Sequence, residues 1–475
     1  MPDLKFYSSD KPKDECGVFG ISATHKESAR QTYFGIFALQ HRGQEAAGIA
    51  VSDGQKVRIH KDIGLVSQVF AEENISQLKG HLAIGHTRYS TTGSSNLRNV
   101  QPMLLDTRYG PVALAHNGNL VNALDLRNQL MEQGFGFTST SDTEIMITML
   151  STAKGETWIE RISEIMPKWK GAYSLVVLTT DGLYAARDPW GIRPLTLGRL
   201  PGGGYAVASE TGALETIGCD SIREVHPGEV VSIHQEALIV KQAVPAKEKL
   251  AKCTFEHIYF SRPDSIWDGK VVHDVRIRLG KQIALENPTE ADVVIPVPDS
   301  SIPAALGYSR ESVIEYDIGL LKNRYIGRTF IQPSQEMRVQ DVNLKFNALP
   351  SVVKGKRVIV IDDSIVRGTT SKHLVDIIRK AGAKEIHFRV SCPPIKNNCY
   401  MGVDMSSPSE LIAHSKSVEE IRGYLQADSL HYLSLNGMMK AVGAEEGYCN
   451  ACFTGEYPFS IDEQRGKMSL ESGLD

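Results

Sequence analysis

The chain lacks the features of a secreted or membrane-spanning protein. No apolar run in its 475 residues is long enough to cross a bilayer. Residues 1–15, MPDLKFYSSDKPKDE, lack the apolar core of a secretory signal. They also carry four acidic residues and no arginine, which is unlike an organelle transit peptide. These absences predict a cytoplasmic protein that does not bind membranes.

The chain also lacks an excess of positive charge and a disulfide pattern. Its net charge is −4 and its pI is near 6.4, whereas nucleic-acid-binding domains are usually basic, so we expect no nucleic-acid partner. Seven cysteines, an odd number scattered through a long chain, do not resemble a disulfide framework. What is present is a hydrophobic fraction of 41%, enough for full cores, in a length that suits two domains.

The most informative stretch is residues 358–371, VIVIDDSIVRGTTS. Its β-branched start is typical of a strand buried on both faces of a parallel sheet. Asp362 and Asp363 follow where that strand should end, and a hydroxyl-rich turn leads into a helical pattern that ends near Gly382. This layout is typical of a nucleotide or sugar-phosphate site, in which the turn and helix N-terminus bind phosphate. The carboxylates would hold ribose hydroxyls or a divalent cation; the alternative is a solvated acidic turn.

The stretch resembles the PRPP-binding loop of type I phosphoribosyltransferases. Its Arg-Gly-Thr-Thr sequence is similar to that of one branch, the glutamine phosphoribosylpyrophosphate amidotransferases (amidophosphoribosyltransferases). The resemblance implies that the acidic pair contacts the ribose hydroxyls and Mg²⁺, and that the turn binds the 5-phosphate. The PRPP-binding residues that it implies are Asp362, Asp363, Ser364, Arg367, Gly368, Thr369, Thr370 and Ser371, together with Lys322 and Arg324.

Two further segments of the C-terminal half carry site predictions. A second apolar strand, residues 293–297, ends before Ser300, which by position would contact the magnesium; a serine there is more often a helix cap. The cationic segment 322–332 would ordinarily be a solvated surface loop. In the family that the chain resembles it is a lid, which excludes water from the reacting ribosyl centre and completes an ammonia path.

Separated polar motifs mark the N-terminal half. Cys16 begins CGVFGISA, which predicts a short strand; such a thiol, taken alone, is usually a small core residue. Residues 85–90, 115–120 and 140–144 lie at the ends of short apolar segments, where site residues tend to lie. Asp181-Gly182 predicts a hairpin turn. Many short strands with few helices predict stacked antiparallel sheets covered by helices.

Together these motifs resemble the glutaminase domain of N-terminal-nucleophile class II amidotransferases over roughly residues 16–235. The resemblance implies that residues 1–15 are a propeptide, cut between Glu15 and Cys16. A free α-amine has a pKa of about 7.7–8.0, so it can act as the base for its own thiol near neutral pH. We therefore predict that the uncut chain lacks glutaminase activity.

The same resemblance implies roles for five more residues. Arg88 would bind the α-carboxylate of glutamine and Asp142 its α-ammonium, with His86 as a further glutamine-binding or supporting residue. Asn117 and Gly118 would donate to the oxyanion as the thiolate attacks the side-chain amide. Taken singly, Arg88 could be a salt-bridge partner, Asn117-Gly118 a turn and Asp142 a helix cap.

Four of the cysteines form the last candidate site. Cys449 and Cys452 form a C-x-x-C pattern, which on its own suits half of a zinc site or a redox pair. The family resemblance implies a structural four-iron, four-sulfur cluster held by Cys253, Cys399, Cys449 and Cys452. Zinc could use the same ligands. Cys219 and Cys392 are left over, and we predict that both are buried.

The chain is therefore predicted to combine an N-terminal-nucleophile αββα sandwich, residues 16–240, with a type I phosphoribosyltransferase parallel-sheet domain and tail, residues 252–475. The charged, proline-containing stretch from about 235 to 251 would be the linker. The implied reaction is glutamine-dependent amination of PRPP. The resemblance also implies inhibition by purine nucleotides and a homo-oligomer, often a tetramer. The alternatives are an amidotransferase with another acceptor and a PRPP-sensing regulator without catalysis.

Overall fold

The computed structural model describes residues 16–24, 27–89, 96–234, 236–323, 346–405, 408–461 and 470. The predicted propeptide, residues 1–15, lies outside the described residues, as do Arg324 and most of the predicted lid. Within the described part of the chain, no helix is long and apolar enough to cross a membrane.

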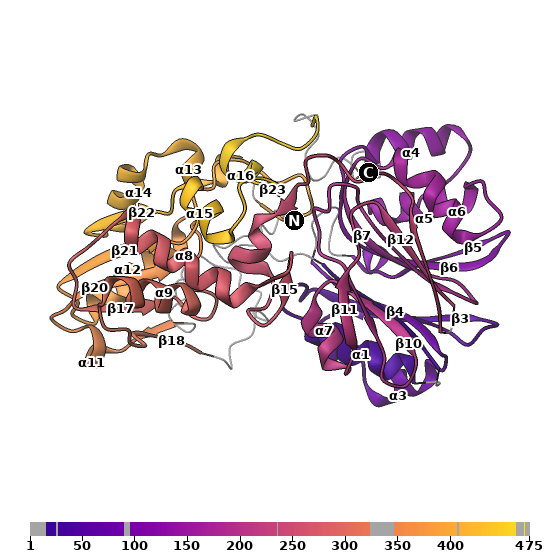
Figure 1. Ribbon diagram of the computed structural model, residues 1–475, viewed down its shortest axis with the longest axis horizontal. Helices are drawn as coiled ribbons and strands as arrows, with labels where there is room; N and C mark the ends of the chain where they lie inside the picture. The colour runs from indigo at the N-terminus through magenta and orange to yellow at the C-terminus, as the bar shows by residue number, and fades with distance from the viewer. Residues whose placement is uncertain are drawn as a thin grey trace, which may run out of the picture.

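Two antiparallel sheets form the N-terminal half of the chain (Figure 1). The first has the order β11-β9-β10-β1-β4-β2-β3. Its strands are β1 (Gly17–Ala23), β2 (Ala46–Ser52), β3 (Val57–Ile63), β4 (Leu82–Arg88), β9 (Thr196–Arg199), β10 (Gly204–Ala208) and β11 (Asp220–Glu224). The second has the order β13-β12-β8-β7-β6-β5. Its strands are β5 (Met103–Thr107), β6 (Gly110–Leu120), β7 (Gly171–Leu178), β8 (Leu183–Arg187), β12 (Glu229–His234) and β13 (Ala237–Gln242).

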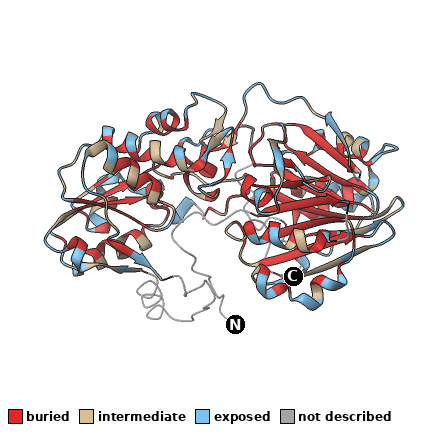
Figure 2. Ribbon diagram, turned by 60° about the horizontal axis from the view of Figure 1, so that its bottom comes forward, coloured by how far each residue is buried: buried red, intermediate tan, exposed pale blue. Residues whose placement is uncertain are grey.

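Helices cover the outer face of each sheet, which gives the predicted αββα layers. Alternate side chains of β1 point to opposite faces: Val18 packs in a cluster shared with the second sheet, and Phe19 packs in the cluster under the helices. Figure 2 shows the inner strands of both sheets as almost continuously buried, whereas edge strands such as β3 and β13 are largely exposed or half-buried. The helices are α1 (Ser28–Ala38), α2 (Val66–Val69), α3 (Glu72–Gln77) and α7 (Thr211–Thr216) on the first sheet, and α4 (Ala123–Glu132), α5 (Asp142–Thr152) and α6 (Trp158–Ile165) on the second.

The linker between the domains begins later than the sequence predicts. Residues Ala237–Gln242 form β13, which pairs with β12 from Glu229↔Gln242 to His234↔Ala237. The sequence ALIVKQ contains β-branched residues that suit an edge strand, although its solvent-facing side chains and neighbouring charges resemble a linker. The antiparallel sheet therefore continues two residues past the predicted domain end at 240.

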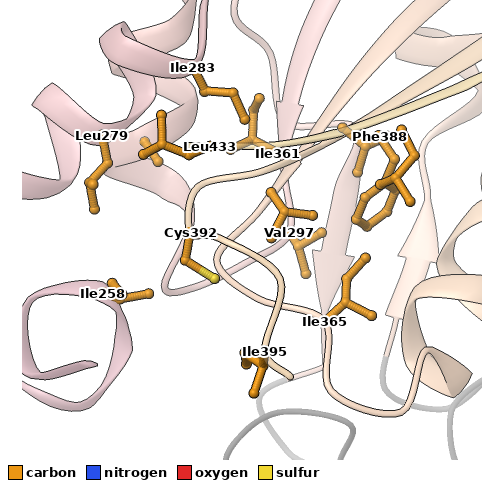
Figure 3. Packing of buried hydrophobic residues seen from close by; sticks show 14 of the residues in the cluster. Ile258, Leu279, Ile283, Val297, Ile361, Ile365, Phe388, Cys392, Ile395 and Leu433 are labelled. Carbon is orange, nitrogen blue, oxygen red and sulfur yellow. The ribbon is translucent and has the colours of Figure 1, made fainter. Parts of the chain in front are cut away.

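The C-terminal half is built on a parallel sheet of order β17-β20-β21-β22. These strands are β17 (Val293–Pro296), β20 (Arg357–Asp362), β21 (Glu385–Val390) and β22 (Ser429–Tyr432). The apolar run of β20 is fully buried, and Ile361 packs among side chains from several elements, including Ile283, Phe388 and Leu433 (Figure 3). The main helices are α8 (Val272–Glu286), α9 (Ile302–Ser312), α12 (Thr369–Lys380), α14 (Val418–Leu425) and α15 (Leu435–Val442).

Short elements complete this half. Two of them, β14 (Lys252–Cys253) and β23 (Tyr448–Cys449), pair in parallel and bring the C-terminal part back to the start of the domain. The others are β15 (Ile266–Trp267), β16 (Lys270–Val271), β18 (Leu320–Lys322), β19 (Phe346–Ala348), α11 (Pro350–Val353), α13 (Ile412–Ser415), α16 (Ala451–Thr454) and a π-helical turn, Glu256–Phe260.

Candidate active sites

A small, mostly polar pocket lies beside Cys16 at the start of β1. The pairing Gly17↔Thr87 places Cys16 next to the end of β4, where Arg88 lies. The second sheet contributes β6, and α5 contributes its N-terminus. The described residues that line the pocket are Cys16, Arg88, Tyr89, Gln101, His116, Gly118, Ser141 and Asp142. Four of the six predicted glutaminase residues, which lie far apart in the sequence, are therefore brought together here.

Asp142 is fixed at the first turn of α5. The Ser141 hydroxyl caps this helix by accepting a hydrogen bond from the Thr143 N–H, and the Leu120 N–H donates to Asp142 at 3.0 Å. Burial opposes ionisation of Asp142, but His116, whose Nδ1 lies 3.6 Å away, and backbone N–H groups lower its pKa below the usual value. The pocket therefore contains an ionised carboxylate suited to an ammonium group.

Arg88 supplies the opposite charge in the same pocket. Burial lowers the pKa of its guanidinium, while the nearby Cys16 and Asp142 act to raise it. Arginine remains protonated despite such shifts, because its pKa starts above 12. A cation and an anion on one pocket wall match the two charges of an α-amino acid.

The Cys16 thiol is not activated in this structure. Its Sγ lies 3.3 Å from the Tyr89 carbonyl oxygen, and burial raises the pKa of Cys16 to about 11 despite the nearby Arg88 charge. The thiolate is the nucleophilic form of cysteine, so this thiol needs a base close to it.

Asn117 and Gly118 lie on β6 beside the pocket. Both polar atoms of the Asn117 side chain are buried and have no hydrogen-bond partner within the described residues. Gly118 has φ +142°, and a Cβ there would lie 2.0 Å from the Ala172 carbonyl oxygen, so only glycine fits. An unpaired buried amide is costly unless it has a functional partner, and an oxyanion would be one.

His86 lies behind the pocket. It is fully buried, its Nε2 lies 3.2 Å from the His116 carbonyl oxygen, and burial lowers its pKa to about 3. It is not among the described pocket-lining residues, so its position suits support of the site. His116 and Gln101, to which the sequence assigned no role, do line the pocket; the Gln101 side chain accepts from the His116 N–H at 2.7 Å. Only the AHNGNL motif pointed towards His116.

The acidic pair in the second domain lies at the carboxyl end of β20, as predicted. Asp362 and Asp363 are almost fully buried, and three serine hydroxyls donate to them. Ser300 donates to Asp363, and Ser364 donates to the same carboxylate at 2.8 Å. The Ser300 side chain, which follows β17, therefore lies next to the acidic pair, which lies at the end of β20. This is the position at which the sequence predicts a metal contact.

The turn after the acidic pair leads directly into α12. Gly368 has φ +82° immediately before the helix, and Thr369, Thr370 and Ser371 form its first turn, where backbone N–H groups lack helical acceptors. This arrangement suits an anionic phosphate. The Arg367 guanidinium forms an ion pair with Glu410 at 2.7 Å.

The nearby Lys322 lies at the end of β18. Its Nζ forms an ion pair with Asp299 at 2.9 Å, close in sequence to Ser300. Arg324, its predicted partner in PRPP binding, lies outside the described residues. The structure therefore places one of the two loop cations near the acidic site.

The four predicted cluster cysteines line one mostly apolar cavity. The pairing Cys253↔Cys449 joins the start of the domain to its end, and Cys399 and Cys452 close the cavity from two other segments. The other lining residues are Ile192, Phe255, Met401, Val403, Met405, Ala451 and Tyr457. No three His, Cys, Asp or Glu side chains of the described chain are grouped as a single metal ion would need. Cys392 is fully buried, but Cys219 is partly exposed, because it follows α7 at the edge of the sheet; its predicted burial is wrong.

A buried ion network joins the two domains behind Cys16. Arg42 donates to Glu210 at 2.5 Å and to Glu256 of the second domain at 2.6 Å, and its Nε lies 3.3 Å from the Cys16 carbonyl oxygen. The Ser261 hydroxyl donates to Glu256 at 2.5 Å, and Arg276 donates to the Ser261 carbonyl at 2.8 Å. Burial outweighs the charge of Asp363 and lowers the pKa of Arg276 to about 10. A continuous set of contacts therefore runs from Cys16 towards the acidic pair.

Comparisons with known proteins agree with both halves. A family model described as "Glutamine amidotransferase domain" matches residues 86–216, and one described as "Phosphoribosyl transferase domain" matches residues 264–420. The fold and its two sites thus define a glutamine amidotransferase joined to a phosphoribosyltransferase.

Relatives similar over their full length identify the combination. An amidophosphoribosyltransferase of Synechococcus elongatus is 49% identical, with 99% of this chain and 97% of the relative covered. That of Bacillus subtilis is 48% identical, with 94% and 95% covered. A solved structure of the B. subtilis glutamine PRPP amidotransferase in complex with ADP and GMP is 47% identical, covers 96% of this chain and 100% of its own, and has a TM-score of 0.90. The chain belongs to the amidophosphoribosyltransferase family.

The activity follows from this membership. The enzyme uses ammonia from glutamine to convert PRPP to 5-phosphoribosylamine, with release of glutamate and pyrophosphate, in the first committed step of purine synthesis. Both alternatives that the sequence left open, a different acceptor and a regulator without catalysis, are therefore set aside.

Proposed function

We propose that the chain is the propeptide-processed, iron–sulfur-containing type of this enzyme, with Cys16 as its nucleophile. The observation that carries this proposal is the pocket in which Cys16, Arg88, Gly118 and Asp142 meet. Its charges match an α-amino acid, and its thiol lies at the residue where removal of 1–15 would create an N-terminus. The cytoplasm is the compartment in which we expect such an enzyme to work.

In the glutamine half, Arg88 binds the α-carboxylate and Asp142 the α-ammonium of the substrate. The freed α-amine of Cys16 takes the thiol proton, and the thiolate attacks the side-chain amide carbon. Asn117 Nδ2 and the Gly118 N–H stabilise the developing oxyanion. Ammonia leaves with the proton, and water hydrolyses the γ-glutamyl thioester to glutamate.

Removal of residues 1–15 should switch the glutaminase on. We compare the full-length chain, protected from cleavage, with a variant that begins at Met-Cys16 and loses its methionine. The uncut chain should hydrolyse glutamine at least about 10²-fold more slowly at pH 7.5, because its buried thiol, with a pKa of about 11, has no base. Glutamate release measures the difference. Equal rates would rule out the need for processing, and ammonia-dependent synthesis in both chains is the control for folding.

In the PRPP half, Asp362 and Asp363 hold the ribose hydroxyls, and residues 367–371 hold the 5-phosphate. Ser300 and the two carboxylates form an oxygen-rich set suited to Mg²⁺, which would neutralise the charge that develops on the leaving pyrophosphate. Lys322 and Arg324 would act from the lid, where they add positive charge and exclude water.

The cysteine cavity fits an iron–sulfur cluster better than one zinc ion. A tetrahedral zinc site draws four thiolates to about 2.3 Å from a single point. Among the described residues, no three such side chains come close enough to hold one metal ion, whereas all four cysteines line the same mostly apolar cavity. Cys253, Cys399, Cys449 and Cys452 would hold the four-iron, four-sulfur cluster, which would tie the end of the chain to the start of its domain.

Replacement of one of these cysteines should remove the metal and destabilise the fold. Cys449→Ser should lose iron and acid-labile sulfide and lower the thermal midpoint by about 5 °C or more, because the β14–β23 connection loses its cross-link. Anaerobic metal analysis and calorimetry measure both effects. The matched control is Cys219→Ser, a cysteine outside the cavity. Zinc in place of iron, or no change in metal content, would contradict the assignment.

Regulation and assembly are further parts of the proposal. The structural neighbour from B. subtilis is a complex with ADP and GMP, which supports purine nucleotides as feedback inhibitors of this chain. We also propose a homo-oligomer, a tetramer by analogy with the family. Inhibition assays with AMP, ADP and GMP, and the mass in solution by light scattering, test these two points.

A further inference from the structure

The segment 399–405 lies between the cysteine cavity and the glutaminase domain. Its odd-numbered residues, Cys399, Met401, Val403 and Met405, line the cavity. The intervening part of the same segment contacts the glutaminase strand β6. One extended stretch of chain is therefore shared by two sites that lie in different domains.

Two kinds of contact hold this segment on β6. The Asn119 side chain donates to the Tyr400 carbonyl at 2.9 Å. Gly402 lies so close to Gly118 that a Cβ added to Gly402 would lie 2.8–2.9 Å from three backbone atoms of Gly118. The two backbones therefore lie so close here that no side chain fits at position 402 unless one of them moves.

A third contact comes from the loop after β8. Arg193 is fully buried, and its Nε and Nη2 donate to the Met401 carbonyl at 2.9 and 2.6 Å. Its own carbonyl accepts from the Ser174 hydroxyl at 3.2 Å, and Ser174 is the cross-strand neighbour of Asn117. The segment is thus linked to β6 directly through Asn119 and indirectly through Arg193 and Ser174 of β7.

We propose that segment 399–405 is a positioning element for the oxyanion hole of the glutaminase. It sets the backbone of Gly118 and the strand position of Asn117, and so controls the turnover of glutamine more than its binding. The proposal rests on the assignment of Asn117 and Gly118 as oxyanion donors. Its physical basis is that loss or displacement of one such donor lowers kcat by about 10²–10³-fold, while ground-state binding by Arg88 and Asp142 is separate.

The main test is Gly402→Ala in the metal-loaded, processed enzyme. The added methyl group should displace Gly118 and lower the glutamine-dependent kcat at least 10-fold. The KM for glutamine and the ammonia-dependent kcat should stay within about two-fold. The matched control is Gly355→Ala, which also has a positive φ, +75° against +99° for Gly402, but nothing within 4 Å of the new Cβ. It separates the contact from the backbone strain of alanine at positive φ.

A second variant avoids any steric overlap. Asn119→Ala removes the hydrogen bond to the Tyr400 carbonyl and should lower the same kcat about 3- to 10-fold. Binding of a γ-glutamyl aldehyde gives a readout independent of turnover: the Cys16 thiol adds to its carbonyl, and the oxygen formed occupies the oxyanion hole. Its inhibition constant should rise in parallel with the loss of kcat, whereas that of glutamate should not change.

The outcomes separate this inference from the proposed function. If Asn117→Ala leaves glutamine hydrolysis unchanged, the oxyanion assignment itself fails. If Asn117→Ala lowers it but Gly402→Ala and Asn119→Ala do not, only the positioning role is overturned. A parallel loss of both the glutamine- and ammonia-dependent activities in Gly402→Ala, with unchanged aldehyde affinity in Asn119→Ala, would show a merely structural contact.

Discussion

Cys16→Ala should abolish glutamine-dependent synthesis and leave ammonia-dependent synthesis intact. Removal of a catalytic nucleophile costs about 10⁴-fold or more in turnover, because no neighbouring group can replace the covalent step. The pocket also holds Arg88 and Asp142, which we propose bind glutamine, but its only described thiol is Cys16. Glutamine should therefore still bind without being hydrolysed.

The measurement is phosphoribosylamine formation from PRPP with either nitrogen source. Free ammonia at pH 8.5 should support a rate within about two-fold of the unaltered enzyme, because the acidic pair lies in the other domain. Cys219→Ala is the matched control and should affect neither activity. An equal loss of both activities would mean that Cys16 supports the fold of the whole chain, and residual glutamine hydrolysis would reveal another nucleophile.

The second large effect is expected from the acidic pair. Asp362→Asn combined with Asp363→Asn should reduce synthesis from both glutamine and ammonia by about 10²–10⁴-fold. Each hydrogen bond to a charged group contributes about 1.5–3 kcal/mol, and two are lost together. Asparagine keeps an oxygen that can accept from Ser300 and Ser364, so the local fold should remain.

The matched control is Asp376→Asn. Asp376 lies on α12, the helix that follows the acidic pair, and its carboxylate forms a partly exposed ion pair with Lys372. Steady-state rates and the affinity for PRPP, measured with and without Mg²⁺, check the prediction. Thermal unfolding should change little in either variant. A loss confined to the glutamine-dependent reaction would show that the carboxylates transmit a signal between the sites without binding PRPP.

Local patterns predicted the second domain well. The run from Val358 to Ser371 is one strand, turn and helix, and each signal in it acts over a few residues: β-branched apolar side chains, adjacent acids and a glycine before the helix. The structure places β20 at Arg357–Asp362 and α12 at Thr369–Lys380, close to the predicted limits. The turn at Asp181-Gly182 is likewise signalled by a few neighbouring residues, and it joins β7 to β8 as predicted.

The missed features depend on contacts between distant parts of the chain. Gln101 lines the pocket beside Cys16 only because β5 and β6 pair and bring its side chain to the His116 N–H. No local pattern marks it. The start of the linker was obscured because the exposed edge strand β13 ends in Lys241-Gln242 and leads into a charged stretch. Resemblance to a family, rather than periodicity, supplied the roles of Asn117 and the four cysteines.

The Arg42 network has a consequence for exchanging domains between enzymes. Arg42 is fully buried between Glu210 of its own domain and Glu256 of the other, so its charge is balanced by a carboxylate that a transplanted glutaminase would leave behind. Glu210 stays with Arg42, so the loss of Glu256 costs less than the about 3–5 kcal/mol of a buried charge with no partner, but still weakens the domain. A chimaera that joins this glutaminase to a foreign acceptor domain should therefore bring an acid to the position of Glu256.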